Sequence, residues 1–94
     1  MLTKDSNGQF LAGDGRVSQN SALACLHTLV FREHNRQCDA ILSKSPALDD
    51  ETVFQLARNK VIGLLQKITF KGYLIDLLGQ QTHSQLVGPY EGYN

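Results

Sequence analysis

The sequence predicts a mainly α-helical chain with two long helices and a short third. Apolar residues recur at spacings of three and four over residues 18–44 and 50–78, which is the period of an α-helix that buries one face. The chain has 94 residues, 41% apolar and 19% charged, without an internal repeat or a low-complexity tract. This composition predicts one folded domain, or part of one, and argues against intrinsic disorder.

Residues 1–17 are predicted to form a loop ahead of the first helix. Gly, Asp, Asn and Ser surround the apolar pair Phe10-Leu11, and Asp14 followed by glycine is a turn signal. The stretch that starts at Asp5 lacks the glycine and the final acidic residue of an EF-hand calcium loop. We therefore expect a simple turn stabilised by the Asp5 side chain.

The first helix is predicted over about 18–44, with its regular part over 21–44. Hydroxyl groups between Ser18 and Ser21 lie where they can cap the free backbone N–H groups of the first turn. The helix is expected to end ahead of Pro46, because the residue before a proline avoids the helical conformation.

The second helix is predicted over about 50–78, with its regular part over 50–70. It begins with the acidic residues 49–51, whose negative charge suits the N-terminus of a helix. Gly72 weakens it locally, and residues 73–78 form the short third helix.

The tail over residues 79–94 is predicted to be a loop. From residue 80 onward it contains two glycines, a proline and two tyrosines. His83 lies in this polar tail, and we expect its side chain to be solvated.

The two long helices are predicted to pack against each other mainly through seven apolar side chains. These are Leu23, Leu26 and Val30 in the first helix, and Phe54, Ala57, Val61 and Leu65 in the second. The second half of the second helix is apolar nearly all round, whereas a helix in an isolated hairpin has only one partner. This excess indicates that the chain is part of a larger fold.

A polar run at residues 32–36 interrupts the apolar pattern of the first helix. Because Phe31 and Cys38 flank it, we expect its charged side chains to be partly buried and paired in a network with neighbouring elements. His27 and His34 are expected to be structural side chains with satisfied hydrogen bonds. His34 and Cys38 lie one helical turn apart, but no further ligands complete a metal site, so none is predicted.

Charge and cysteine usage argue against several classes of protein. Nine basic residues balance nine acidic ones and the pI is about 6.8, which argues against a nucleic-acid or membrane-surface binder. No apolar run reaches the roughly 18 residues of a membrane span, and residues 1–15 contain no signal-peptide core. Cys25 and Cys38 lie about 20 Å apart on one helix, too far for a disulfide between them.

Three short motifs carry more specific information: FLAGDGR at residues 10–16, LHTL at 26–29 and REHNR at 32–36. Together they resemble the animal haem peroxidase family, the superfamily of myeloperoxidase, peroxidasin and cyclooxygenase. The resemblance extends over about residues 9–94, including QKIT at 66–69 and GPY at 88–90. It implies that residues 1–94 are an excerpt of the all-α haem peroxidase domain.

The resemblance implies a haem cofactor, with hydrogen peroxide and a small electron donor or a halide as substrates. Arg16 matches the family's distal arginine, whose fixed charge stabilises the leaving oxygen of peroxide. Gln19 lies where many members have a glutamate that forms an ester with the haem. Asn20 lies where the myeloperoxidase branch has a haem-linked methionine. Gln19 and Asn20 both carry amides, so neither covalent link to haem is expected here. Together with Arg16 they are the three predicted haem-binding residues.

By the same resemblance, the distal and proximal histidines and the calcium loop of the parent domain lie outside this segment. His27, His34 and His83 match neither histidine. We therefore expect residues 1–94 alone neither to bind haem specifically nor to turn over peroxide, because haem affinity rests on iron ligation in a closed pocket. The implied partner is the remainder of the peroxidase domain, and the implied location is extracellular or secreted.

Two alternative functions stay open. The pair Cys38-Asp39 favours a fatty-acid dioxygenase or cyclooxygenase-like member of the same superfamily, whereas His27-Thr28 favours a peroxidase. The other alternative is a truncated, non-catalytic helical module that binds another protein through its exposed apolar faces.

Overall fold

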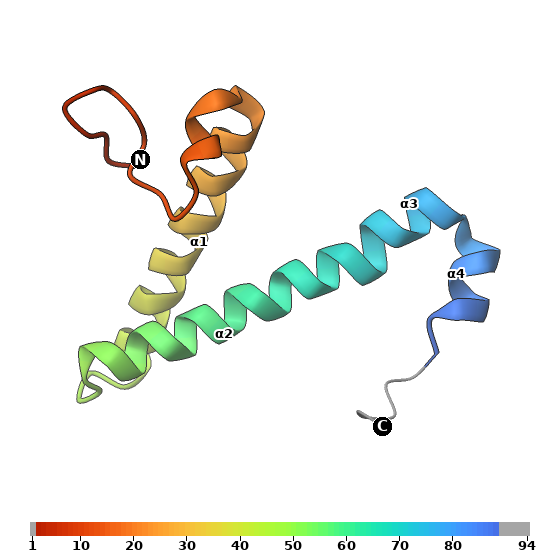
Figure 1. Cartoon of the computed structure of the whole chain (residues 1–94). Helices are drawn as coiled ribbons and strands as arrows, with labels where there is room; N and C mark the ends of the chain where they lie inside the picture. Colours follow the sequence, from red (N-terminus) through yellow and green to blue (C-terminus); the bar gives the residue numbers. More distant parts are fainter. Residues whose placement is uncertain (1, 89–94) are drawn as a thin grey trace. The chain divides into compact units, whose positions relative to one another are not determined.

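A computed structural model describes residues 2–88 and confirms the mainly α-helical class (Figure 1). The elements are η1 (Gly15–Gln19), α1 (Ser21–Lys44), α2 (Asp50–Ile68), η2 (Thr69–Tyr73), α3 (Leu74–Leu78) and α4 (Gln80–Leu86). η1 is a 3₁₀ turn and η2 a π-helical turn. The described residues contain no strand, only an isolated antiparallel bridge between Lys4 and Phe10. The chain divides into two compact units after Val61, which are described separately.

The first unit begins with the tight turn that the sequence predicts around Asp5. Oδ1 of Asp5 accepts the backbone N–H groups of Asn7 and Gln9, both at 2.9 Å. Gly8 has a φ of 77°, which a residue without a Cβ adopts readily. The expectation of a simple turn here is confirmed.

The N-terminus of α1 differs from the prediction, since an amide rather than a hydroxyl caps it. Oδ1 of Asn20 accepts the N–H of Leu23 at 3.1 Å, and α1 begins one residue after Asn20. Ser18 lies earlier, inside η1, where its Oγ accepts the N–H of Phe10 at 2.9 Å. The 3₁₀ turn η1 extends to Gln19, so it includes residue 18, where the first helix was predicted to start. Asn20 then becomes the last extended residue, and asparagine caps a helix as well as serine does.

The turn between the two long helices follows the prediction. α1 ends at Lys44, two residues before Pro46. Asp49 accepts the backbone N–H of Thr52 at 3.1 Å and its hydroxyl at 2.7 Å, so it caps α2. These hydrogen bonds to Thr52 lower the pKa of Asp49 below its ordinary value.

A small apolar cluster next to this turn joins α1 to the first part of α2. It consists of Ile41, Val53 and Ala57, with Cys38 and Leu48 packed against it. Of the seven predicted core residues, Ala57 and Val61 are buried, whereas Leu26, Phe54 and Leu65 are exposed. The prediction is wrong for Leu26 and Leu65, whereas Phe54, although partly exposed, does pack on α1 through the ring of His34. In the first unit α1 and α2 meet at the turn and then diverge (Figure 1). Leu26 lies early in α1, at the end away from the turn, and is exposed.

In the second unit, helical structure continues past the position where the sequence predicts a weak point. Around Gly72 the backbone widens into the π-helical turn η2 and returns to α-helix in α3. Gly79, with a φ of 79°, ends α3. Such insertions occur mostly as single turns inside α-helices, which is the arrangement here.

The prediction of a loop after residue 79 is wrong over the seven residues of α4. Gly79 changes the direction of the chain, and a new helix starts directly after it. His83 is half-buried rather than solvated, because its Nε2 lies 2.6 Å from the carbonyl oxygen of Phe70. The predicted loop over 89–94 lies outside the described residues. Among residues 2–88, no helix combines the length and apolar character needed to cross a membrane.

Candidate functional site

The three predicted site residues lie in and directly after η1, ahead of α1. Asp14 begins this turn, since its Oδ1 accepts the N–H of Arg16 at 2.9 Å. Val17 anchors the turn where η1 contacts α1, and its side chain is fully buried. The segment therefore has a defined conformation with Arg16 on its exposed side.

The guanidinium group of Arg16 is held by the carboxylate of Asp14. Nε lies 3.0 Å from both carboxylate oxygens, and Nη2 contacts Oδ2. Their hydrogen bond raises the pKa of Arg16 and lowers the pKa of Asp14. The Arg16 side chain is 77% exposed. Asp14 uses the Nε and Nη2 edge, so Nη1 is the group that a ligand oxygen would meet first.

Gln19 and Asn20 differ in how far their amides are already engaged. Gln19 ends η1 with an exposed side chain that forms no hydrogen bond within residues 2–88. The amide oxygen of Asn20 is committed to the α1 cap, which leaves its NH₂ group for a ligand. The structure thus brings a cation and two amides together along one short segment. Their roles toward haem stay predictions.

The polar run at residues 32–36 forms a local pair and does not join helices. Glu33 accepts Nε and Nη2 of Arg36, both at 2.7 Å, and Nε2 of Gln37 at 2.6 Å. These contacts lie within α1, so the predicted network does not form with another element of residues 2–88. Residues three and four apart share one face of a helix, which satisfies the charges without a second element. The hydrogen bonds from Arg36 and Gln37 lower the pKa of Glu33 to about 2.

His27 and His34 are structural side chains, but only one is satisfied. Nδ1 of His27 lies 2.9 Å from the carbonyl oxygen of Leu23, as expected. His34 packs its ring on Phe54 with centroids 5.1 Å apart, and its Nδ1 lies 3.7 Å from Sγ of Cys38. Its Nε2 is buried without a hydrogen-bond partner in the described part of the chain, so the expectation fails for that atom.

No group of three or more His, Cys, Asp or Glu side chains within residues 2–88 is placed to hold a metal ion. Cys25 and Cys38 are both free thiols on α1.

Sequence reasoning missed the clamp that Asp14 places on Arg16. The available signal was an Asp at the start of a turn, two residues before the arginine, since this spacing suits both an Asx turn and an ion pair. It also missed Ser18, whose hydroxyl joins η1 to the N-terminal loop. Both side chains support the backbone that carries Arg16.

The chain is similar to segments of several longer proteins. The family model described as animal haem peroxidase matches residues 2–94. Over 85 residues the chain is 48% identical to thyroid peroxidase of Mus musculus and 40% identical to a peroxidasin homologue of Caenorhabditis elegans. It is 44% identical to lactoperoxidase of Mus musculus. Each alignment covers 90% of this chain, but only 9%, 6% and 12% of the respective relative.

Proposed function

The chain belongs to the animal haem peroxidase family, and on that premise we propose that it forms part of a haem-dependent peroxidase. The proposed reaction is the reduction of hydrogen peroxide coupled to the oxidation of a small donor or a halide. The observation that carries this proposal is the geometry of Arg16. Its guanidinium is fixed by Asp14 at the start of η1, with one edge free.

Arg16 is suited to stabilise the negative charge that develops when peroxide is cleaved. When the O–O bond breaks heterolytically, negative charge develops on the leaving oxygen. A guanidinium remains protonated at every relevant pH, and hydrogen bonding to Asp14 raises the pKa of Arg16 further. A cation held in place before the reaction stabilises that charge without reorganising.

Haem, when bound, supplies the redox-active iron at which peroxide is reduced. The residues present fit one side of such a pocket: Arg16, Gln19 and Asn20 offer N–H groups to oxygen atoms. By the family resemblance, none of the three histidines matches a haem-ligating position; in addition, Nε2 of His83 lies 2.6 Å from the carbonyl oxygen of Phe70, and His34 packs on Phe54. In this proposal the histidine that would hold the iron belongs to the remainder of the peroxidase domain.

Gln19 and Asn20 position the cofactor non-covalently in this proposal. An ester to a haem methyl requires a carboxylate, and Gln19 carries an amide, which is a poor nucleophile. The amide oxygen of Asn20 is engaged with the N–H of Leu23, so this residue stabilises the start of α1 at the same time. The proposed setting is extracellular or secreted, as the family resemblance implies.

The test uses the longest polypeptide encoded in frame with residues 1–94, loaded with haem. Replacing Arg16 by Gln should lower the rate of peroxide consumption about a hundredfold, because one charged donor to the transition state is lost. Arg16→Lys should recover part of the rate. Arg58→Gln, a change at an exposed arginine of α2, is the control and should leave the rate unchanged. Equal rates for the Arg16→Gln variant and the unmodified protein would contradict the proposal.

A further inference from the structure

His34 and Cys38 form a thiol–imidazole pair on one face of α1 that the proposed reaction does not use. Nδ1 of His34 lies 3.7 Å from Sγ of Cys38, which is within hydrogen-bond reach of a sulfur atom. The ring of His34 also packs on Phe54 of α2, with the ring centroids 5.1 Å apart and the planes tilted by 55°. These two contacts hold the imidazole next to the thiol.

The surroundings of His34 determine which ring nitrogen carries the proton. A neutral imidazole has one N–H donor and one acceptor nitrogen. Nε2 is buried without a hydrogen-bond partner among residues 2–88, so a proton on Nε2 would be an unsatisfied buried donor. A proton on Nδ1 instead meets the sulfur of Cys38. The neutral ring therefore carries its proton on Nδ1 and donates a hydrogen bond to Sγ.

This donor and the position of Cys38 favour one kind of reagent. An N–H group at the sulfur stabilises the negative charge of a thiolate, which is the form of cysteine that attacks electrophiles. Cys38 is half-buried and packs against the apolar cluster of Ile41, Val53 and Ala57. A small, uncharged oxidant such as hydrogen peroxide reaches such a sulfur more readily than a bulky reagent does.

We propose that Cys38 is a site of oxidation by hydrogen peroxide, with His34 as the residue that positions and stabilises its thiolate. The thiol first releases its proton to water. The thiolate sulfur then attacks one oxygen of the peroxide, so that an S–O bond forms and the O–O bond breaks. Sulfur gives up two electrons and becomes a sulfenic acid, while the other oxygen leaves as hydroxide and takes up a proton to form water. The step requires neither haem nor Arg16, so its failure would leave the proposed function untouched.

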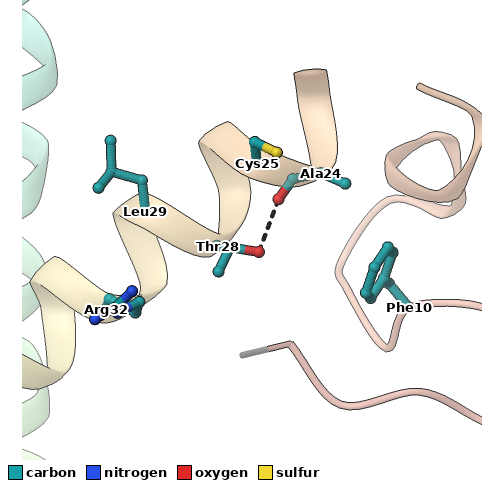
Figure 2. A pocket seen from close by; sticks show the side chains of 6 residues that line it. All are labelled: Phe10, Ala24, Cys25, Thr28, Leu29 and Arg32. Atoms are coloured by element: carbon teal, nitrogen blue, oxygen red, sulfur yellow. Dashed lines mark hydrogen bonds between the residues drawn. The ribbon is translucent and has the colours of Figure 1, made fainter. Parts of the chain in front are cut away.

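Cys25 provides an internal comparison on the same helix. It is exposed and lines an open groove of about 350 Å³ between the N-terminal loop and α1 (Figure 2). The other residues that line this groove are Phe10, Ala24, Thr28, Leu29 and Arg32, none of which is a histidine. Cys25 and Cys38 lie about 20 Å apart along α1, too far for a disulfide, so Cys25 of the same chain does not consume the sulfenic acid of Cys38.

The test is oxidation of the 94-residue chain by dilute hydrogen peroxide near neutral pH. Dimedone traps the sulfenic acid, and peptide mass spectrometry measures the labelling of each cysteine. Cys38 should be labelled about tenfold faster than the more exposed Cys25, because a hydrogen bond to a charged sulfur is worth about this factor. In urea, where the fold is lost, the two rates should agree within about a factor of two. Equal or faster labelling of Cys25 in the folded chain, or a preference for Cys38 that survives in urea, would overturn the proposal.

Two substitutions separate the hydrogen bond of His34 from its packing. His34→Phe keeps an aromatic ring on Phe54 but removes the donor, so it should slow the labelling of Cys38 about tenfold and leave Cys25 unchanged. His34→Asn loses the ring but supplies an amide N–H near the position of Nδ1, so it should recover much of the rate. His83→Phe on α4 is the matched control and should leave both rates unchanged.

Circular dichroism checks that each variant retains its helices. If His34→Phe loses them, His34→Ala against His34→Asn makes the same comparison without a ring in either variant. A merely structural role of the ring predicts the reverse order, with His34→Phe fast and His34→Asn slow. That order, or labelling of Cys38 that is as fast without the donor as with it, would refute the proposal.

Discussion

Replacing Asn20 by Ala should lower the free energy of unfolding of the chain, because it removes the cap of α1. The hydrogen bond from the N–H of Leu23 to Oδ1 is 3.1 Å long and exposed. Removing such a cap typically costs about 1 kcal/mol. For a chain of this size a loss of about 1 kcal/mol lowers Tm by roughly 4–8 °C. Asn20→Asp retains the acceptor and adds negative charge at the helix N-terminus, so it should be at least as stable as the unmodified chain.

The assay is thermal unfolding of the 94-residue chain, followed by circular dichroism at about 222 nm, the α-helix band. Gln19→Ala is the matched control, since Gln19 is adjacent, exposed and without a side-chain hydrogen bond in the described residues. It should change the free energy of unfolding by less than about 0.5 kcal/mol. If Asn20→Ala and Gln19→Ala shift Tm equally, or if Asn20→Asp destabilises as much as Asn20→Ala, the cap is not the structural role of Asn20.

Three further predictions concern the core, the charge pair and the cofactor. Ile41→Ala should destabilise by about 2 kcal/mol in urea unfolding, because three nearly buried carbon atoms are lost, while Leu29→Ala should cost about half as much or less. If the two costs are equal, α1 and α2 do not pack as described. The pKa of Glu33 lies near 2, below its ordinary 4.5, so its contribution to stability is complete above about pH 4.5 and is lost as the pH falls toward 2. Glu33→Gln should remove that part of the acid sensitivity, and an unchanged pH profile would argue against the pair. In the haem-loaded longer polypeptide, Gln19→Glu should yield a haem-modified peptide after peroxide cycling, whereas a haem adduct already present at Gln19 in the unmodified protein would contradict the non-covalent assignment.

The elements of local origin were predictable from particular residues. Asp5 forms its turn with the next few backbone N–H groups, Asp49 caps α2, and Pro46 follows the end of α1. Each depends on side chains within about four residues of the backbone they bond, and such contacts follow directly from the order of residues. The motif at residues 10–16 pointed to the family in the same way, and the family match confirms that assignment.

The predictions that were wrong concern which faces of the helices pack against each other. Leu26 fits the helical period as well as Ile41 does, but of the two only Ile41 lies close enough to the turn to be covered. Similarly, the carboxylate of Glu33 pairs with Arg36 on the same helix and not with a residue of another helix. Helical periodicity defines an apolar face, but how far along that face a second helix extends depends on the direction in which the chain leaves the turn.

The sequence by itself determined the helical class, the turns and caps that separate the helices, and the family. These depend on short-range hydrogen bonds and on residue order. Only the tertiary structure decided that Ser18 bonds to the backbone N–H of Phe10, that His83 bonds to the carbonyl of Phe70, and that Arg32 borders an uncovered groove. Each of these facts depends on the path of the backbone in three dimensions. That path is set by the summed packing of many weak contacts, which the spacing of residue types along the chain does not encode position by position.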